Sequence, residues 1–550
     1  MPRHATRGLS RLRPPRYCRA MPESPPRAER ARTAEVIAAL SLATDLGTGL
    51  PLEHGLESTL VAMRLGECLG VDSDTASQTY YACLLFYVGC TADAEIAADL
   101  FDGDLHSNFT PVMFGSRGEV LRGLTRALAP PGSAAPIRAA YVVRRLPAMV
   151  RTHARHLAAI CEVGEMLTHR LGLPAPVQSL FAGFTERWDG KGGPGGAKGD
   201  EIPLAVRIVH VARDATFQHR LGGPAYAADV IRERAGGALD PEIARTLAEK
   251  AATILESDSG GSSWEETLAC EPGARLTLQG EAIERALAAM GDFADLISPY
   301  LAGHSAGVAR LAGAAAGRCG LAPAEVRLVR RAALVHDLGR VAVATRIWQK
   351  PGPLTADEWE QVRLHAYHSE RVLARSPFLA DLSGVAGAHH ERLDGSGYHR
   401  GAPGAALPLP ARLLAAADAY HAMTEPRPHR DALTAEQAAE QLAREAGAGR
   451  LDADAVAAVV EAAGQRAPQV ERPAGLTHRE AEVIGMLARG LQTKQVARGL
   501  GISVKTADRH IQHAYRKIGV STRAAATLFA MEHGLVTWGE LPIARPEGRS

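Results

Sequence analysis

The 550-residue sequence lacks the features that anchor a chain in a membrane or cross-link it. No apolar run approaches the roughly eighteen residues that a membrane span needs, and aromatic residues make up only 5% of the chain. The seven cysteines, from Cys18 to Cys319, include no Cys-x-x-Cys pair. This spacing argues against a disulfide framework or a thiolate zinc site. We therefore expect a cytoplasmic protein with reduced thiols and no membrane partner.

Charge of one sign is also lacking, because the formal net charge is only +1. Any affinity for nucleic acid must then come from a local basic surface. The first twenty residues hold six arginines and no acid, but no apolar segment follows them. We expect a disordered basic tail over residues 1–32 instead of a targeting segment, with Met21 as an alternative start.

An internal repeat organises most of the chain. Three pairs of segments match in the same order: Glu186–Gly192 with Glu391–Gly397, Ile202–Leu204 with Leu407–Leu409, and Leu84–Gly89 with Leu334–Gly339. The periodicity of apolar residues is helical nearly throughout, and Thr355–Glu358 is a capping box. Ser298 before Pro299 indicates a helix start, and Gly339 stands where a helix C-cap is expected.

These signals predict a mainly α fold, in which a duplicated helical domain precedes a small helical domain. We place the first copy at residues 33–255, a linker at 256–279 and the second copy at 280–465. A second linker at 466–474 leads to the small domain at 475–537, and residues 538–550 form a tail. Single cores rarely grow to this length, which favours several domains.

The second copy concentrates side chains that bind metals. They are His304, His336, Asp337, His365, His389, His390 and Asp418. An isolated histidine on an apolar helix face is usually an ordinary core residue. Here, however, His304 shares a face with Val308 and Leu311, and Asp418 follows Leu414 by one turn, so both point inward and need partners.

Imidazole and carboxylate together suit iron, manganese or similar divalent ions, and a carboxylate can bridge two of them. Two such ions activate water and stabilise both the attacking and the leaving oxygen at a phosphodiester, so no side-chain nucleophile is needed. Arg340, Arg427 and Arg430 are candidates for holding phosphate oxygens, although arginines are more often solvated surface residues.

Four segments, in this order and spacing, resemble the successive motifs of the HD-GYP phosphodiesterases. They are His336–Arg340, Lys350–Thr355, His389–Tyr398 and Arg427–Arg430. Members of this family are helical and hydrolyse cyclic di-GMP at a binuclear or trinuclear metal centre, often of iron.

The resemblance covers roughly residues 295–465 and implies roles for individual residues. The seven residues above would be the metal ligands, with Asp337 as the bridge and Arg340 beside it in catalysis. Tyr398 would stack on a guanine base, and Arg427 and Arg430 would bind phosphate.

The second copy departs from the family pattern at several positions. Arg340 replaces a lysine, His399 replaces the final proline of the motif, and His421 replaces a second aspartate. Tyr300 stands where trinuclear members carry a glutamate, so we expect two divalent metal ions, iron or manganese.

The first copy does not keep the metal ligands. Phe86 and Tyr87 stand where the second copy has His336 and Asp337, and Phe184 and Thr185 replace His389 and His390. His54, His153 and His156 cannot be aligned from the sequence alone. We expect this copy to bind no metal and to serve in dimerisation or sensing.

The small C-terminal domain has the succession of a helix-turn-helix. Thr477–Glu480 is a capping box, Gly490 ends that helix, and Lys494–Leu500 forms the next one. Gly501 and Ile502 make the turn, and Ser503 caps a basic helix that runs to Ile518.

Over its whole length this domain is similar to LuxR-type regulators, whose last long helix enters the major groove. Asp508, Arg509 and Gln512 would face bases, although a lysine is usual at position 508. The other residues expected to contact DNA are Lys505, Thr506, Arg516 and Lys517.

The sequence therefore predicts a phosphodiesterase for cyclic dinucleotides, most simply cyclic di-GMP, joined to a DNA-binding regulator that acts as a homodimer. Two alternatives remain. In the first, the HD-GYP domain is a non-catalytic nucleotide sensor within a transcription factor. In the second, it is an HD phosphohydrolase that acts on another phosphoester.

Overall fold

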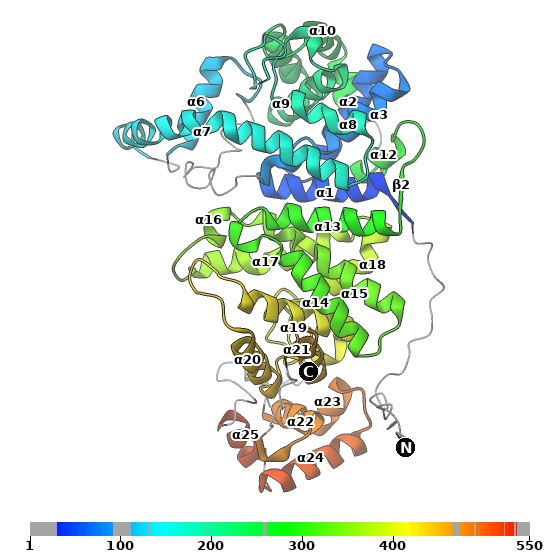
Figure 1. Cartoon of the computed structure of the whole chain (residues 1–550), viewed down its shortest axis with the longest axis vertical. Helices are drawn as coiled ribbons and strands as arrows, with labels where there is room; N and C mark the ends of the chain where they lie inside the picture. Colours follow the sequence, from blue (N-terminus) through cyan, green and yellow to red (C-terminus); the bar gives the residue numbers. More distant parts are fainter. Residues whose placement is uncertain are drawn as a thin grey trace, which may run out of the picture.

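A computed structural model of the chain describes residues 30–91, 112–129, 133–193, 195–256, 261–465, 473–488, 491–521, 523–532 and 535. Three helical bundles follow one another along the long axis of the molecule (Figure 1). Within the described ranges, the only sheet is a pair of three-residue strands. The expectation of a mainly α fold is confirmed. None of the helices in these ranges has both the length and the apolar character needed to cross a bilayer.

The first bundle begins with β1 (Arg30–Arg32) and ends with α12. Its α-helices are α1 (Thr33–Thr48), α2 (His54–Leu69), α3 (Ser73–Leu84), α6 (Arg117–Ala127), α7 (Ala135–Arg170), α8 (Ala175–Gln178), α9 (Leu204–Arg234), α10 (Pro241–Glu249), α11 (Ala251–Leu255) and α12 (Ser263–Ala269). Its 3-10 turns include η1 (Val88–Thr91), η3 (Ser179–Gly183) and η4 (Gly199–Glu201). Asp72 caps α3 and Asp240 caps α10 by accepting backbone N–H groups.

The second bundle follows β2 (Thr277–Gln279). Its α-helices are α13 (Glu281–Asp295), α14 (His304–Arg318), α15 (Pro323–Val335), α16 (Thr345–Trp348), α17 (Ala356–Leu373), α18 (Pro377–Ala386), α19 (Leu409–Thr424), α20 (Ala435–Gly447) and α21 (Ala453–Ala462). The 3-10 turns are η5 (Pro299–Leu301), η6 (Leu338–Ala342) and η7 (Gly404–Ala406). Thr355 caps α17 and forms the expected capping box with Glu358.

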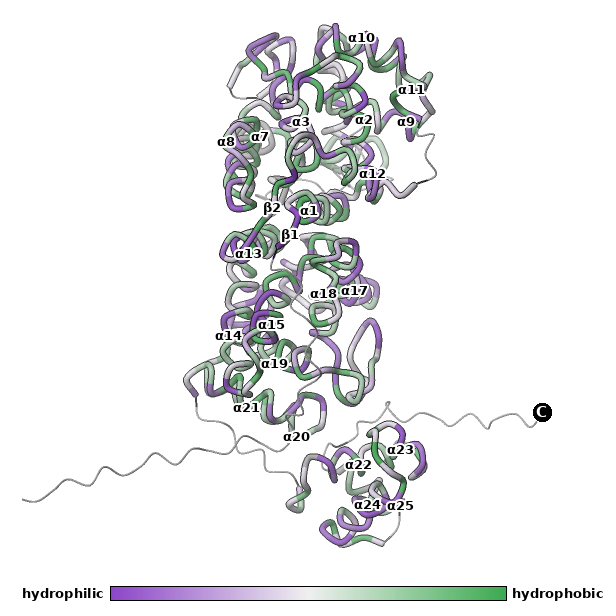
Figure 2. The backbone as a smooth tube through the Cα atoms, turned by 90° about the vertical axis from the view of Figure 1, so that its right-hand side faces the viewer, coloured by the Kyte–Doolittle hydropathy of each residue, from purple (hydrophilic) through white to green (hydrophobic). Residues whose placement is uncertain are grey.

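The C-terminal bundle contains η8 (Pro473–Gly475), α22 (His478–Ala488), α23 (Thr493–Gly499), α24 (Val504–Ile518) and α25 (Arg523–Glu532). As expected, Thr477 and Glu480 form a capping box, and the Ser503 hydroxyl accepts from the Thr506 N–H at the start of α24. The helix end expected at Gly490 lies outside the described residues. This bundle has a hydrophobic core of its own, and Figure 2 shows it set apart from the other two.

One continuous hydrophobic core runs through the first two bundles. Helices α1 and α13 lie on the two sides of the level where the bundles meet (Figure 1). Helix α1 packs against η6 and α17 of the second bundle, and α13 packs against α7 of the first. A Cβ at Gly47 in α1 would lie 3.1 Å from Val341 Cβ in η6. Arg375 pairs with Glu53 at 2.7 Å, and Arg170 pairs with Asp292 at 2.5 Å.

Residues 256–279, expected to be a linker, are not a plain connector. They contain α12 and β2, and β2 pairs antiparallel with β1. Trp264 of α12 is buried, so burial of apolar side chains fixes a segment whose composition is that of a loop. Residues 30–32 of the expected basic tail form β1, whereas residues 1–29 lie outside the described part.

Of two expectations about helix ends in the second copy, one holds only for a short 3-10 helix and the other was wrong. Ser298 and Pro299 open only the short turn η5, and α14 begins at His304 after Gly303, whose φ of 79° lies in the left-handed region. Gly339 is not a C-cap but lies within η6. A Cβ at Gly339 would lie 2.2 Å from the His365 carbonyl oxygen of α17. Glycine is therefore needed there for close packing of two segments.

Candidate metal centre

The structure brings all seven expected ligands together at the centre of the second bundle. His304 is the first residue of α14, His336 and Asp337 join α15 to η6, His365 lies in α17, His389 and His390 follow α18, and Asp418 lies in α19. Six of the seven are buried, and His390 is half-buried. Five separate segments thus converge on one small volume.

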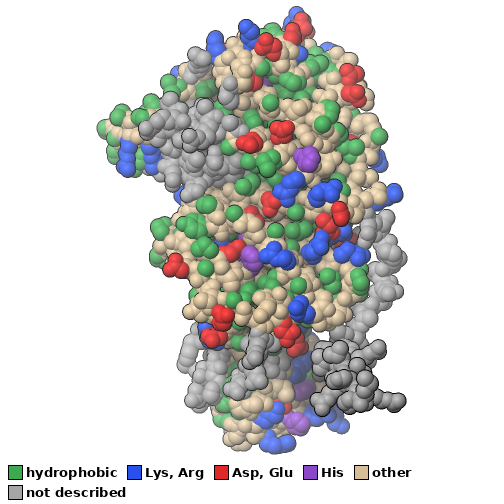
Figure 3. Space-filling view, in the orientation of Figure 1, with side chains coloured by type: hydrophobic (Ala, Val, Ile, Leu, Met, Phe, Trp, Pro, Cys, Tyr) green, Lys and Arg blue, Asp and Glu red, His purple; other side chains and the backbone are tan. Residues whose placement is uncertain are grey.

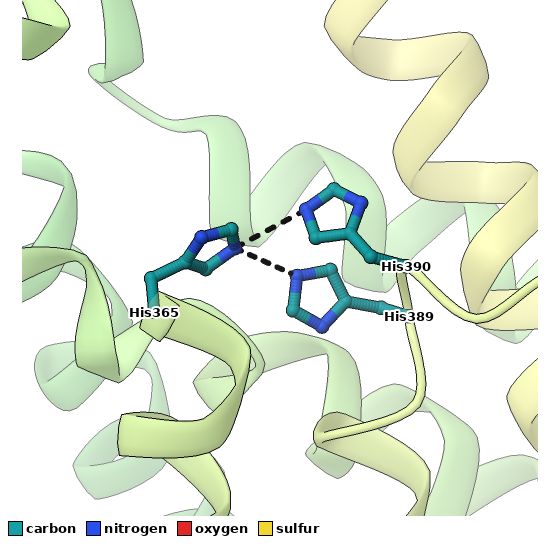
Figure 4. Close-up of side chains that lie close together, drawn as sticks. All are labelled: His365, His389 and His390. Atoms are coloured by element: carbon teal, nitrogen blue, oxygen red, sulfur yellow. Dashed lines mark hydrogen bonds between the residues drawn. The ribbon is translucent and has the colours of Figure 1, made fainter. Parts of the chain in front are cut away.

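The ligands form two adjacent groups. His365, His389 and His390 make the first group, in which His365 Nε2 lies 3.1 Å from Nε2 of each of the other two (Figure 4). The second group is His304, His336, Asp337 and Asp418. Within each group, one potential ligand atom per residue lies within 4.8 Å of the others.

Asp337 lies between the two groups. Its Oδ1 atom is 3.3 Å from His365 Nε2 and 3.4 Å from His389 Nε2. Its Oδ2 atom is 2.9 Å from His336 Nε2 and 3.4 Å from His304 Nε2. The two oxygens of one carboxylate therefore face different groups of imidazoles, which is the arrangement that a bridging ligand requires.

Three of the histidines are oriented by the backbone. The Nδ1 atoms of His336, His365 and His389 each bond the carbonyl oxygen three residues earlier. A carbonyl only accepts, so Nδ1 carries a proton and Nε2 is the atom left to bind a metal at the centre. Such partners commonly orient metal-bound histidines.

Polar atoms at the centre lack well-directed hydrogen bonds. Both Asp337 oxygens and His336 Nε2 are buried without such a bond. Burying unpaired polar atoms costs free energy unless a cation is bound among them. The mixture of imidazole and carboxylate fits a divalent transition metal. The residues present therefore fit a metal centre.

Charge at the centre is divided between the two groups. Burial alone would raise the pKa of Asp337, but Arg340 and His336 hold it well below its usual range. Burial and Arg340 oppose protonation of His304, yet Asp337, Asp418 and Glu425 raise its pKa to about 10. Burial also opposes protonation of His336, but Asp337 and Asp418 raise its pKa to about 9. Without metal, protons on His304 and His336 therefore balance the carboxylates. Burial lowers the pKa of His389 to about 4, so this ring is neutral and able to bind metal.

Arg340 lies directly beside Asp337. Its Nη2 atom is 2.7 Å from Asp337 Oδ2, and the side chain is almost fully buried over the Trp348 ring. The Nε and Nη1 atoms have no hydrogen-bond partner. These free donors at the centre are consistent with the expected phosphate contact.

Tyr398 packs against the centre. Its ring stacks on His390 at 4.4 Å between centroids, and the Arg363 guanidinium lies 5.7 Å from the ring centroid. Burial raises the pKa of Tyr398, so the phenol stays neutral. Stacking of Tyr398 on a substrate base remains a prediction.

Hydrogen bonds to one buried carboxylate hold the loop that carries Tyr398. Glu391 accepts backbone N–H groups of Arg400 and Ala402 at 2.9 and 2.8 Å. His399 follows Tyr398 with φ of 76°. Proline cannot adopt this angle because its ring fixes φ near −65°. The departure from the family's proline thus accompanies a different backbone conformation.

The two arginines expected to bind phosphate are engaged within the protein. Arg430 donates from Nη1 and Nη2 to the carbonyl oxygens of Ala422, Met423 and Glu425 around the end of α19. Arg427 donates to Glu425 Oε2 at 2.8 Å and to the Tyr300 carbonyl oxygen. A phosphate role for either residue remains a prediction, and it would require these contacts to loosen.

Aromatic side chains and an arginine occupy the equivalent centre of the first copy. Phe86 stacks on Phe184 at 5.1 Å, and the Arg213 guanidinium lies 4.8 Å from the Phe86 ring centroid and 4.4 Å from that of Tyr87. The register that matches Ile202–Leu204 with Leu407–Leu409 puts Arg213 opposite Asp418. A buried cation therefore stands where the second copy has an acidic ligand.

The structure also aligns two positions that the sequence left open. A Cβ at Gly89 would lie 2.0 Å from the Ile160 carbonyl oxygen, just as one at Gly339 would approach His365, so Ile160 replaces that ligand. His54 begins α2 as His304 begins α14. It is the one ligand position that the first copy retains. The side chains of His153 and His156 lie outside the described part.

Three elements of the site escaped the sequence analysis. Glu425, 2.8 Å from His304 Nδ1, was not recognised, and neither were the contacts of His421 with it or the role of Gly307. The signal available was the pairing of an unexpected His421 with a carboxylate one helical turn later.

Helix α24 exposes most of the residues expected to contact DNA. Lys505, Asp508, Arg509, Gln512 and Arg516 are exposed, and Thr506 is half-buried. Figure 3 shows basic and histidine side chains on this end of the molecule. Lys517 differs, since its ammonium group is 2.6 Å from Glu480 and donates to the Gly475 carbonyl oxygen. It therefore ties α24 to the start of α22.

Comparison with family models identifies both parts of the chain. The HD domain model matches residues 128–243 and 289–455, together just over half of the chain. The chain therefore belongs to the HD domain family. The model of the luxR family of bacterial regulatory proteins matches residues 474–530. Both resemblances seen in the sequence are confirmed.

Similar proteins include proteins named as phosphodiesterases for cyclic dinucleotides. The 3′3′-cGAMP-specific phosphodiesterase 3 of Vibrio cholerae is 28% identical over 416 residues, which are 74% of this chain and 89% of that protein. A cyclic di-GMP phosphodiesterase response regulator of Xanthomonas campestris is 37% identical over 142 residues, covering 26% of this chain and 38% of that protein.

A solved structure shares the fold. The crystal structure of a cyclic GMP-AMP-specific phosphodiesterase of V. cholerae aligns with a TM-score of 0.54 and 23% identity, covering 79% of this chain and 98% of that chain. The coverage extends beyond the second copy alone.

Proposed function

We propose that this protein is a metal-dependent phosphodiesterase for 3′,3′-linked cyclic dinucleotides whose C-terminal domain binds DNA. The observation that carries the proposal is Asp337, whose two oxygens face two separate groups of histidines. The proposal places two divalent ions, iron or manganese, in those groups. Its setting is the cytoplasm, where both the nucleotide and DNA are available.

The seven ligands would hold the metals through Nε2 atoms and carboxylate oxygens. Bound there, the two ions supply an activated water and neutralise charge on the phosphodiester. Arg340 is placed to donate Nε–H and Nη1–H to a phosphate oxygen. Tyr398 borders the centre and offers an aromatic surface to a base. The protein itself then needs no side-chain nucleophile.

The choice of cyclic dinucleotides rests on the relatives, one named for 3′3′-cGAMP and the other for cyclic di-GMP. These substrates share two 3′,5′ phosphodiesters and at least one guanine. The match to the cGAMP enzyme spans most of both chains, so 3′3′-cGAMP deserves testing beside cyclic di-GMP. The sequence predicts a cyclic dinucleotide, most simply cyclic di-GMP.

The DNA-binding role rests on α24, which presents Lys505, Arg509 and Arg516 to solvent in a domain of the LuxR family. We further propose that the protein binds its site as a homodimer, as two-fold symmetric DNA sites favour. The first bundle, which lacks the ligand set, is the candidate surface for dimerisation or sensing.

One experiment separates the candidate activities. Full-length protein loaded with Mn²⁺ or Fe²⁺ is incubated with cyclic di-GMP, 3′3′-cGAMP and p-nitrophenyl phosphate, and the products are separated by chromatography. Cleavage of a cyclic dinucleotide supports the proposal. Cleavage of the monoester alone indicates another phosphohydrolase, and tight binding of a dinucleotide without cleavage indicates a sensor.

A further inference from the structure

We propose that Glu425 is the positioning residue for the metal ligand His304, and that Gly307 and His421 make this arrangement possible. The inference rests on the proposed function, since it concerns the same metal centre. Glu425 Oε2 lies 2.8 Å from His304 Nδ1, while Nε2 of the same ring lies 3.1 Å from Asp418 Oδ1 and 3.4 Å from Asp337 Oδ2. One ring thus joins Glu425 to the centre.

His304 needs such a partner more than the other buried ligands do. His336, His365 and His389 each bond a backbone carbonyl three residues earlier. His304 is the first residue of α14, so no α-helical turn precedes it. The acceptor comes instead from Glu425, directly after the end of α19. A carboxylate on Nδ1 fixes the tautomer and makes Nε2 a stronger ligand.

Glu425 is itself held from two sides. Its Oε2 atom accepts from Arg427 Nη2 at 2.8 Å, and its Oε1 atom lies 3.2 Å from His421 Nδ1. The side chain is only 17% exposed. His421 stands where the family pattern has an aspartate. The structure therefore retains a carboxylate beside His304 but supplies it one helical turn later.

Gly307 provides the space that His421 occupies between α14 and α19. A Cβ at Gly307 would lie 1.8 Å from His421 Nε2 and 2.3 Å from its Cε1. In the first copy the equivalent positions are Glu57, Thr216 and Arg220, where Glu57 and Arg220 form an ion pair at 2.5 Å. The glycine, the histidine and the glutamate of the second copy thus act together.

The decisive variant is Gly307→Ala in the full-length protein. Alanine is the better helix former, so helix propensity alone predicts no loss. The clash with His421 should displace that ring and Glu425, and weaken Mn²⁺ binding by about 10- to 100-fold. Gly317→Ala is the matched control, because Gly317 lies in the same helix with nothing within 4 Å of its Cβ position.

Binding is measured on metal-stripped protein by competition between the protein and a chelator for Mn²⁺, and the fold is checked by thermal unfolding before metal is added. Glu425→Ala should weaken binding similarly. Glu425→Gln should weaken it less, because its amide oxygen still accepts from Nδ1. The double variant Gly307→Ala/His421→Ala should recover affinity relative to Gly307→Ala, since the clash is gone and Arg427 still holds Glu425.

The outcomes separate this inference from the proposed function. A wild-type protein that takes up no Mn²⁺ would contradict the proposed function. A wild type that binds Mn²⁺, with Gly307→Ala and Glu425→Ala equal to Gly317→Ala, would contradict only the positioning role. Failure of the double variant to improve on Gly307→Ala would likewise overturn the role given to His421 and Gly307.

Discussion

At the scale of single residues, Asp337 gives the centre its shape because histidines from four segments lie around its two oxygens. We predict that Asp337→Ala lowers bound metal by more than the 10- to 100-fold that loss of an outer partner costs, and abolishes hydrolysis. Metal content by mass spectrometry and a turnover assay check this. Asp431→Ala, an exposed carboxylate change, is the control. Near-normal metal content and activity in Asp337→Ala would rule out a bridging role.

A second residue-scale prediction concerns pH. Burial raises the pKa of Asp45 from 3.8 to about 7, and its carboxylate accepts the Gly55 N–H. The folded state therefore binds this proton more tightly than the unfolded state. The contribution of Asp45 to stability should be greatest below about pH 4, fall as pH rises to about 7 and stay level above that.

Asp45→Asn should remove most of this dependence and raise the free energy of unfolding at pH 8 by on the order of a few kcal/mol. The amide oxygen can still accept from Gly55. Urea unfolding at pH 5 and pH 8 provides the measurement, with the exposed Asp74→Asn as the control. Identical pH profiles for the two variants would show that Asp45 does not titrate as described.

Four of the seven candidate metal ligands, His336, Asp337, His389 and His390, could be named from the sequence because they belong to short motifs that occur in a fixed order. His304 and Asp418 were indicated by their places on apolar helix faces. The partners of those ligands could not be named. Glu425 reaches His304 only because α14 packs on α19, and no local pattern specifies which residues meet across two helices. Arg213 was missed for the same reason, since its role depends on stacking with Phe86 and Tyr87.

At the scale of elements, the sequence predicted helix starts correctly where a residue next to the helix supplies the capping side chain. Thr355, Thr477 and Ser503 start helices as expected, because a side-chain oxygen accepts an N–H group three residues later. The C-cap predicted at Gly339 was wrong because glycine occurs both at helix C-caps and where two segments pack closely. The choice between these uses depends on α17, which is distant in sequence.

Helix α24 carries the element-scale prediction. Lys505 and Arg516 lie towards its ends, so replacing either with alanine should weaken all duplexes similarly and reduce the salt slope by roughly one. Arg509→Ala or Gln512→Ala should cost about 1–3 kcal/mol on the preferred site and much less on random DNA. Fluorescence anisotropy across a salt series measures both effects.

One further variant sharpens that test. Asp508→Lys should tighten non-specific binding, because it replaces an acid beside the phosphates with a base. Lys517 is unsuitable for the salt series, since its contact with Glu480 means that its loss also destabilises the bundle. If the full-length protein, with or without a cyclic dinucleotide, shows no salt-sensitive binding to any duplex, α24 is a surface for a protein partner instead.

At the scale of the whole molecule, the structure divides the chain differently from the sequence pattern. The repeat predicts two separate copies joined by a linker, but one core passes through both. Strand β1, directly before the first copy, pairs with β2, directly before the second. Sequence periodicity identifies helices and repeats. It does not reveal whether two repeats pack into one unit, because that depends on complementary surfaces.

The last prediction follows from this shared core, because α1 of the first copy packs on the segment that carries the HD motif. Gly47→Val should push against Val341 in η6, where the native gap to a Cβ is only 3.1 Å, and destabilise the protein by about 1–3 kcal/mol. Because η6 directly follows Asp337, metal affinity should fall too, although Gly47 belongs to the copy without ligands. Gly384→Val is the control, since it also lies in a helix but has nothing within 4 Å of its Cβ position. Urea unfolding and Mn²⁺ competition measure the two effects, and equal behaviour of the two variants would mean that the first copy does not support the metal centre.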